Sequence, residues 1–129
     1  MKRVACLLIL MLMSVNIISC ASVSTVGSDG QQSVVSKAWI AIEDGAFLID
    51  VRSESEFAAG AIGGAVNIPH DQIINRANEL GVDKERRIVV YCRSGRRAGI
   101  AESSLRKLGF KNVLNAGGYS DLLRSKSTT

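Results

Sequence analysis

The segment RIVVYCRSGRRAGIAESSLRKLG, residues 87–109, joins the most strand-prone stretch of the chain to an amphipathic helical pattern. Its β-branched and aromatic residues at 87–91 favour a buried strand. The apolar residues of its second half fall near one face of a helix: Ile100, Leu105 and Leu108. Gly109 is a typical helix end. The pattern therefore predicts a strand, a short connection that holds Cys92, and then a helix.

The same alternation of short apolar runs and helical stretches continues through the chain. Strands are predicted at 47–50, 65–69, 87–91 and 112–115. Helices, each closed by a glycine, are predicted at 36–45, 53–60, 71–81 and 98–109, and a short last helix follows a turn at 116–118. Strands that alternate with helices indicate parallel pairing. The sequence predicts the α/β class, as a single domain with a central parallel sheet flanked by helices.

Local side-chain patterns support these helices. Ser53 and Glu56 form a capping-box pattern at the start of the second helix. Ser36 is the expected N-cap of the first helix, in which Trp39 and Ile42 share one face. The residues expected to point inward from the third helix are Ile73, Ile74, Ala77 and Leu80.

Residues 1–19 have the pattern of a secretory signal peptide. Lys2 and Arg3 give a charged start, and the apolar stretch after them is too short to cross a bilayer comfortably. Residues 17–20, Ile-Ile-Ser-Cys, are similar to the bacterial lipoprotein box, in which the cysteine, here Cys20, is acylated. An ordinary signal peptide is the alternative.

The lipoprotein pattern predicts an exported protein on the periplasmic side of a bacterial envelope, held at the membrane by a lipid anchor on Cys20. Ala21, in place of an aspartate, favours the outer membrane. Residues 20–33 are small and polar without a helical or strand period, which predicts a flexible tether. Residues 34–129 then form the folded domain, and this length leaves no room for a second one.

The charge balance gives no sign of nucleic-acid binding. The chain has 16 Lys and Arg residues and 12 Asp and Glu residues. Removal of Lys2 and Arg3 with the signal peptide leaves 14 basic residues against 12 acidic ones, a net charge near +2 that is spread along the chain. A nucleic-acid-binding domain carries a concentrated basic surface instead.

The cysteine count makes Cys92 the only thiol of the mature chain, since Cys6 leaves with the signal peptide and Cys20 carries the lipid. A left-over cysteine in an exported protein is either buried and inert or a reactive thiol. One thiol and the single His70 do not supply the ligand cluster that zinc requires, so no metal is expected. We expect His70 to be a surface residue without a catalytic role.

The predicted position of Cys92 favours the reactive thiol. It lies at the carboxyl end of a central strand, where open parallel sheets bind ligands. The amides at the start of the next helix stabilise anions, and Gly95 lets the backbone curl so that several amides point at one centre. Arg93, Arg96 and Arg97 add positive charge, which favours the thiolate form of the sulfur.

Three motifs in this order resemble the rhodanese family, the thiosulfate sulfurtransferases: LIDVRSESEFAAGAIGGAVNIP at 48–69, IVVYCRSGRRA at 88–98 and GFKNVLNAGGY at 109–119. In size and export signal the chain looks like the single-domain periplasmic members. The resemblance implies that Cys92 is the catalytic nucleophile. It implies a substrate-binding loop made of Arg93, Ser94, Gly95, Arg96 and Arg97. It also implies that Asp50 and Arg52 support this loop, and ordinary surface charge is the alternative for these two residues.

The sequence departs from the family pattern in one segment. The usual Gly-His-Ile-Pro-Gly-Ala is Gly-Ala-Ile-Gly-Gly-Ala at 60–65, so that the histidine and the proline are both missing. Glycine in place of proline raises the entropy of the unfolded chain, which puts the rigidity of this segment in doubt. Close to it in the sequence, we expect an ion pair between Arg52 and Glu56.

The activity that the resemblance implies is transfer of sulfane sulfur. The Cys92 thiolate attacks the outer sulfur of thiosulfate, sulfite leaves, and the persulfide passes its sulfur to cyanide or a thiol acceptor. Arg93 and Arg97 are expected to contact the substrate, Arg96 is left open, and Ser94 supplies loop geometry. No cofactor is needed. A persulfide carrier or sulfur-binding module without efficient turnover is the alternative.

Phosphatases and arsenate reductases of related fold also place a cysteine and an arginine around an amide-lined loop. The tyrosine-phosphatase spacing requires an arginine at position 98, where this chain has Ala98, and Arg97 comes one residue early. The shorter loop suits a sulfur atom better than a tetrahedral phosphate. The spacing therefore favours sulfur transfer.

Overall fold

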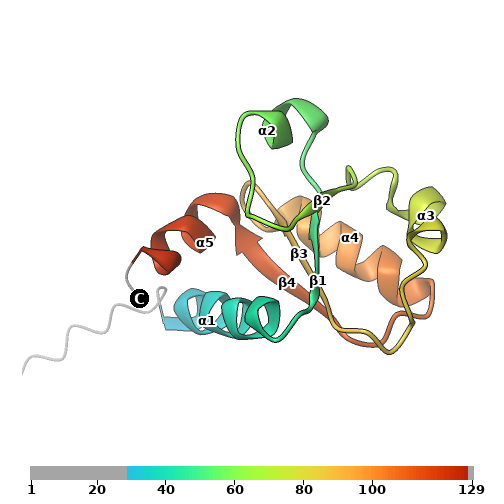
Figure 1. Cartoon of the computed structure of the whole chain (residues 1–129), viewed down its shortest axis with the longest axis horizontal. Coiled ribbons are helices and arrows are strands. Elements are labelled where there is room, and N and C mark those ends of the chain that lie inside the picture. The colour runs from blue at the N-terminus through green and yellow to red at the C-terminus, as the bar shows by residue number, and fades with distance from the viewer. Residues whose placement is uncertain (1–28, 128–129) are drawn as a thin grey trace, which may run out of the picture.

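The computed structural model describes residues 29–127. The predicted signal peptide and Cys20 lie outside the described residues. The elements run in the order α1 (Asp29–Glu43), β1 (Phe47–Asp50), α2 (Glu54–Ala58), β2 (Val66–Asn67), α3 (Ile73–Arg76), the 3-10 turn η1 (Ala77–Leu80), β3 (Ile88–Cys92), α4 (Arg96–Lys107), β4 (Val113–Gly118) and α5 (Tyr119–Lys126) (Figure 1). Within the described range, none of the helices combines the length and the apolar content needed to cross a membrane.

The four strands form one parallel sheet in the order β2-β1-β3-β4, which confirms the predicted α/β class. From β1 the chain first moves to β2 on one side and then returns to β3 on the other. This reversal creates a switch point between β1 and β3, where the connections that follow the two strands lead to opposite sides of the sheet. Asp50 at the end of β1 pairs with Tyr91, the residue before Cys92 on β3. The first motif, at 48–69, and the second, at 88–98, therefore lie side by side at this point.

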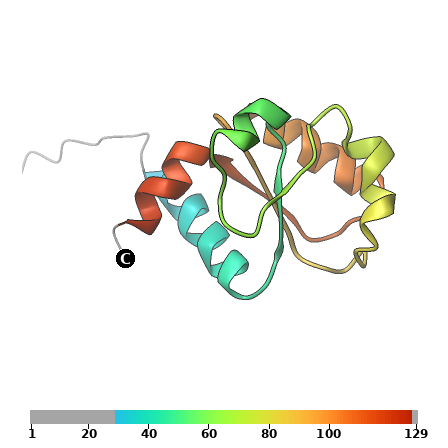
Figure 2. The ribbon, with the colours of Figure 1, turned by 45° about the horizontal axis from the view of Figure 1, so that its top comes forward.

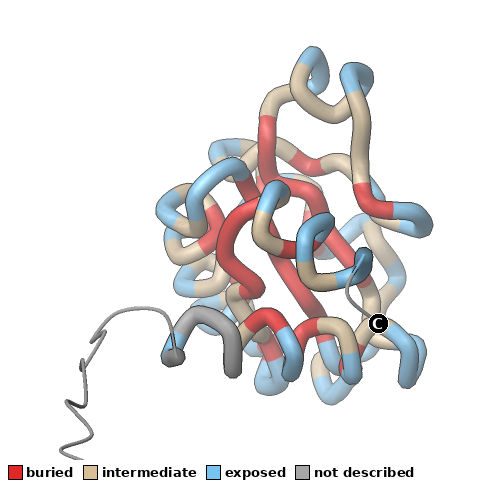
Figure 3. Tube along the Cα trace, turned by 90° about the vertical axis from the view of Figure 1, so that its left-hand side faces the viewer, coloured by how far each residue is buried: buried red, intermediate tan, exposed pale blue. Residues whose placement is uncertain are grey.

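Helices cover both faces of the sheet, and the side chains of β3 alternate between the two layers. Ile88, Val90 and Cys92 belong to the core shared with α3 and α4. Val89 and Tyr91 belong to the core shared with α1 and α5. Figure 2 shows the two pairs of helices on opposite sides of the strands, and Figure 3 shows the buried residues concentrated in the middle of the molecule. Every residue of β3 is buried, as expected for the central strand of a sheet covered on both faces.

Helix α1 is longer than predicted. It begins at Asp29 and not after Ser36, so residues 29–33 of the predicted tether are helical. Val35 and Ala38 are buried against the sheet, and this packing also stabilises the helical turn that precedes them. The polar residues before them show no hydrophobic period, but tertiary contacts decide the helicity of such a stretch more than local propensity does.

Ile74, which was expected to point inward, is exposed, and so is Ile100, which was expected near one face with Leu105 and Leu108. On α3, Ile73 and Ala77 take the buried face and Ile74, one position along, is left exposed. The predicted helix at 71–81 is in fact a single α-helical turn followed by η1. On α4, the smaller Ala101 faces the core and Ile100 is exposed. In both helices the spacing of three to four residues selects one face, and the neighbouring apolar residue falls outside it.

Two strand boundaries also differ from the prediction. The strand expected at 65–69 pairs only over Val66–Asn67. The turn expected at 116–118 belongs to β4, which continues to Gly118. An irregularity in the β3–β4 register accommodates these residues: Val90 pairs with Asn115 and Cys92 with Gly118, so β4 has one residue more than β3 between the two pairs. Such a bulge lets a glycine-rich segment stay in the sheet.

Candidate active site

Cys92 is the last residue of β3 and lies at the switch point of the sheet. The residue is 1 % exposed, so its sulfur is enclosed by the loop that follows. It is a free cysteine, and the backbone N–H of Gly95 donates a hydrogen bond to its Sγ over 3.1 Å. An N–H that points at the sulfur stabilises a negative charge there. The first predicted feature of the cysteine loop, an amide directed at the sulfur, is therefore present.

Gly95 is required at its position for two reasons. It is the N-cap of α4 and has φ +89°, a backbone conformation that favours glycine. A Cβ on this residue would also lie 3.2 Å from the Cα of Gly117 on β4. The left-handed turn at Gly95 brings its N–H back toward Cys92, and the close contact with β4 fixes where the turn lies.

The end of β4 packs against the cysteine loop. A Cβ on Gly118 would lie 2.8 Å from the carbonyl oxygen of Arg93, so the loop and the strand touch through their backbones. Asn115 donates from Nδ2 to the carbonyl oxygen of Gly95 over 3.0 Å. No sequence pattern marks Asn115 as a site residue, and it lies in the third motif directly before the predicted turn at 116–118.

Arg97 is held by a bidentate ion pair with Glu56. Its Nη1 and Nη2 donate to the two carboxylate oxygens over 2.7 and 2.9 Å, which connects α4 to α2. The hydrogen bonds from Arg97 lower the pKa of Glu56 to about 2, and those from Ser53 act in the same direction against partial burial. The pKa of Arg97 is raised, chiefly by Glu56 and further by the nearby Cys92. Arg97 thus binds the carboxylate of Glu56 and lies near enough to Cys92 for the two groups to interact electrostatically.

The expected ion pair between Arg52 and Glu56 is wrong, because each residue has another partner. Glu56 completes the predicted capping box with Ser53 and binds Arg97. Arg52 turns inward and forms a buried ion pair with Asp50, with 2.6 Å between Nη2 and Oδ2. Asp50 lies two residues before Arg52, and in an extended chain residues two apart point to the same side. This favours the pairing with Asp50 over one with Glu56 on the helix.

The buried Asp50–Arg52 pair supports the segment that departs from the family pattern. Arg52 donates from Nη2 to the carbonyl oxygen of Gly60 over 2.6 Å, and its guanidinium lies 4.2 Å from the ring centroid of Tyr119. The hydroxyl oxygen of Tyr91 accepts a hydrogen bond from the N–H of Ile62 over 3.0 Å. Burial raises the pKa of Tyr91. These contacts hold residues 60–62 although the proline of the family pattern is missing.

The remaining loop residues are exposed at the mouth of the site. Arg93, Ser94 and Arg96 all have exposed side chains. A hollow of about 590 Å³ is lined by Arg97 and by mostly polar residues of two segments, 53–55 and 69–72. His70 belongs to this lining. Among residues 29–127 the structure contains no group of His, Cys, Asp and Glu side chains that could hold a metal ion.

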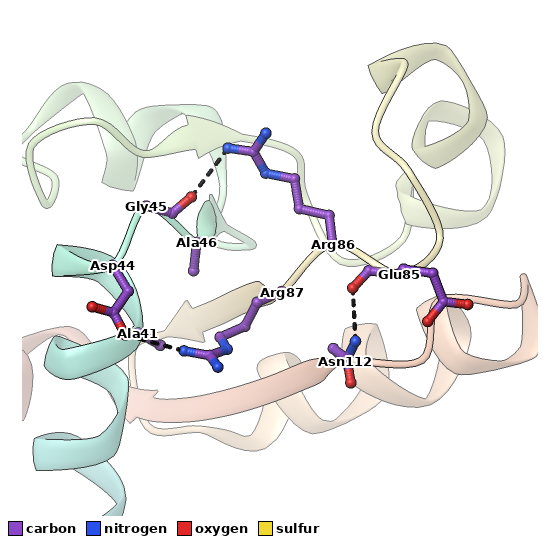
Figure 4. Close-up of a pocket in the computed structure, with 8 residues that line it drawn as sticks. All are labelled: Ala41, Asp44, Gly45, Ala46, Glu85, Arg86, Arg87 and Asn112. Atoms are coloured by element: carbon purple, nitrogen blue, oxygen red, sulfur yellow. Dashed lines mark hydrogen bonds and ion pairs between the residues drawn. The ribbon is translucent and has the colours of Figure 1, made fainter.

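A second hollow, of about 430 Å³, lies at the opposite edge of the sheet (Figure 4). Its residues Ala46, Arg87 and Asn112 directly precede β1, β3 and β4. Its polar side chains bind one another or the backbone, as in the 2.7 Å bond from Asn112 Nδ2 to the carbonyl oxygen of Glu85. Cys92 is not among the residues that line this hollow, since it lies at the carboxyl edge of the sheet.

The parallel sheet with a cysteine loop at its switch point matches a known family. Residues 35–125 match the rhodanese-like domain. The chain belongs to this family. Thiosulfate sulfurtransferase PspE of Escherichia coli is 36 % identical over 78 residues, which cover 60 % of this chain and 75 % of that protein. The human single-domain sulfurtransferase TSTD1 has a similar structure, with a TM-score of 0.60 and 30 % identity over 69 % of this chain and 90 % of that one.

Rhodanese relatives do not all have the same role. A putative sulfur carrier protein of Bacillus subtilis, YrkF, is 41 % identical over 68 residues, which cover 53 % of this chain but only 36 % of that protein. The resemblance predicted from the three motifs is confirmed at the level of the family. The homology supports sulfur transfer in general, and the particular donor and acceptor depend on the site.

Proposed function

We propose that this rhodanese transfers sulfane sulfur from thiosulfate to cyanide or a thiol acceptor through a persulfide on Cys92. The observation that carries the proposal is the position of the Cys92 sulfur, enclosed at the switch point of the sheet with the Gly95 N–H directed at it. A relative named as a thiosulfate sulfurtransferase supports the choice of donor. No cofactor takes part in the proposed reaction.

The proposed reaction has two nucleophilic steps. The Cys92 thiolate attacks the outer sulfur of thiosulfate, a new S–S bond forms, and the S–S bond of thiosulfate breaks as sulfite leaves with the electron pair. The acceptor then attacks the outer sulfur of the persulfide, and the Cys92 thiolate leaves with its electron pair. The Gly95 N–H is placed to stabilise the charge on sulfur at both stages.

The enclosed sulfur favours a small, narrow donor. Because Cys92 is 1 % exposed, only the end of a slender molecule reaches it without a large movement of the loop. Arg93 and Arg96 lie exposed at the mouth and attract thiosulfate and the departing sulfite by charge. Arg97 faces Cys92 from its place beside Glu56.

The first test is intact-mass spectrometry of protein lacking residues 1–20, before and after addition of thiosulfate. Both cores of the domain consist of residues from 35 onward, so this protein retains all of them. We expect the mass to increase by one sulfur atom in the wild type and not in Cys92→Ser. Cyanide should remove the sulfur and release thiocyanate over many turnovers. No gain of sulfur with thiosulfate would refute the proposed donor.

The similarity to a putative sulfur carrier supports a second candidate function, that of a persulfide carrier without efficient turnover. A carrier would accept one sulfur per Cys92 and release it only to a protein partner. In the same experiment it would gain the sulfur atom but form no more than one thiocyanate per protein. The number of turnovers therefore separates the enzyme from the carrier.

We also propose that the chain is exported and acylated at Cys20, from the lipoprotein-box pattern at residues 17–20. The test is expression of the full chain in a bacterial host with a radiolabelled fatty acid, followed by detergent phase partition. We expect label in the detergent phase for the wild type and none for Cys20→Ser. Label-free protein in the aqueous phase for both would instead support an ordinary signal peptide.

A further inference from the structure

The carboxamide of Asn115 connects β4 to the cysteine loop. Its Nδ2 donates to the carbonyl oxygen of Gly95 over 3.0 Å. Its Oδ1 accepts a hydrogen bond from the N–H of Gly117 over 2.9 Å, which fixes the orientation of the carboxamide. The side chain is half-buried at the bulge in the β3–β4 register, so its two contacts are partly shielded from water. Asn115 therefore has one fixed orientation, with its donor on the loop.

Gly95 is the residue that Asn115 holds and also the residue that binds the sulfur. Its N–H donates to Cys92 Sγ over 3.1 Å. Its carbonyl oxygen accepts from Asn115 and from the N–H of Gly99, the latter over 2.9 Å. A backbone with φ +89° persists where the surroundings hold it in place. Because φ and ψ of Gly95 relate its carbonyl to its N–H, a contact on the carbonyl also restricts the direction of the N–H.

The carboxamide lies close to the backbone of two neighbouring segments. A Cβ on Gly99 would lie 3.5 Å from the Nδ2 of Asn115, an ordinary van der Waals distance, so the first turns of α4 pack directly beside the amide. On the other side, the Cα of Gly117 lies against Gly95. Asn115 is thus surrounded by backbone, and a side chain of another shape would not reach both of its hydrogen-bond partners.

We infer that Asn115 is a positioning residue for Cys92: by holding the Gly95 carbonyl it keeps the Gly95 N–H directed at the sulfur. It does not touch the sulfur itself. The inference rests on the proposed function only in taking Cys92 as the reacting group. It predicts that loss of the contact slows every reaction of the Cys92 thiolate, with or without thiosulfate.

Two variants separate the contact with Gly95 from other effects. Asn115→Ala removes both hydrogen bonds and adds no charge. Asn115→Asp keeps an acceptor for the Gly117 N–H but replaces the donor to the Gly95 oxygen by a second acceptor, which repels it. Asn112→Ala is the matched control, because Asn112 donates to the carbonyl oxygen of Glu85 at the other edge of the sheet.

The experiment measures the rate of Cys92 alkylation by iodoacetamide at neutral pH, and kcat and KM for sulfur transfer, in the full mature chain. We expect both Asn115 variants to be alkylated about tenfold more slowly, the ratio that the loss of one hydrogen bond of ordinary strength gives. The control should react as the wild type does. In sulfur transfer, kcat should fall about tenfold with KM nearly unchanged, since Asn115 does not contact the donor.

Folding is checked by thermal unfolding, and the Gly95 amide is followed by its ¹H–¹⁵N resonance, which should move in both Asn115 variants and not in the control. Wild-type alkylation of either Asn115 variant would overturn the inference. In particular, slow alkylation of Asn115→Ala with a wild-type rate for Asn115→Asp would assign the effect to Gly117 instead of Gly95. Absence of sulfur transfer in the wild type would refute the proposed function but leave the alkylation test intact.

Discussion

The ion pair between Glu56 and Arg97 leads to a prediction about stability that depends on pH. Glu56→Gln removes the charge but keeps an oxygen that accepts from Ser53, because glutamine also serves in a capping box. The substitution therefore tests the electrostatic contact between α2 and α4 and leaves the start of α2 in place. We expect the variant to be less stable than the wild type at pH 7.

The size of this effect follows from the pKa of Glu56, which falls from 4.5 to about 2 in the folded protein. At about 1.4 kcal/mol for each tenfold change in proton affinity, this difference corresponds to at most about 3.5 kcal/mol. Arg97 and Glu56 remain 27 % and 29 % exposed. Screening by solvent therefore reduces the expected loss of unfolding free energy in Glu56→Gln to about 1–2 kcal/mol.

The sign of the pH dependence follows from the direction of the change. Because the pKa of Glu56 is lower in the folded state than in the unfolded state, the pair stabilises the protein fully above pH 4.5. This contribution is lost as the pH falls from 4.5 toward about 2, where the folded protein also takes up the proton. The difference between wild type and Glu56→Gln should shrink over the same range.

The assay is urea unfolding of both proteins at several pH values between 3 and 7. Glu102→Gln is the control, because it removes an exposed pair with Arg106 on a single helix. Such a pair contributes about 0.3–0.5 kcal/mol. A stability difference for Glu56→Gln that is no larger than that of the control at pH 7, or that stays constant down to pH 3, would refute the reasoning.

Three further substitutions test other parts of the site. Arg52→Ala leaves the buried Asp50 without its partner and should lower the free energy of unfolding by about 3–5 kcal/mol in urea titrations, and a loss below 1 kcal/mol would contradict the buried pair. Gly45→Ala, with φ +86° and free space around it, should cost only the backbone strain of about 1–3 kcal/mol and leave alkylation unchanged. Gly95→Ala should cost more than this and slow alkylation of the thiol, because its Cβ would also lie 3.2 Å from the Cα of Gly117. Cys92→Ser should abolish thiocyanate formation with little change in the unfolding midpoint, and residual turnover above background would exclude this thiol as the nucleophile.

The sequence predicts the sheet because its central strand carries a strong local signal. All residues of β3 are apolar or aromatic, and both faces of a central strand are buried. The capping box of Ser53 and Glu56 is equally local, since its two residues lie on one helical turn. Features of this kind need no knowledge of distant parts of the chain.

Contacts between distant segments could not be predicted in the same way. Glu56 and Arg97 are 41 positions apart, and only the packing of α2 near the start of α4 brings them together. The same holds for Asn115 and Gly95, which are 20 positions apart. A charged or amide side chain has several possible partners, and the sequence does not rank them without the fold. Arg52 has an acidic residue on either side in the sequence, Asp50 and Glu56, and only the fold shows that Asp50 is its partner.

The three arginines of the cysteine loop differ in how their charge is balanced. The carboxylate of Glu56 compensates the charge of Arg97 in a bidentate pair, so Arg97 adds little to the net field at the mouth of the site. Arg93 and Arg96 are exposed and, within residues 29–127, form no ion pair with an acidic side chain. The uncompensated positive charge of this segment is therefore that of Arg93 and Arg96, and its attraction for an anion in solution should weaken with salt. Arg97, held by Glu56, contributes less to this long-range attraction.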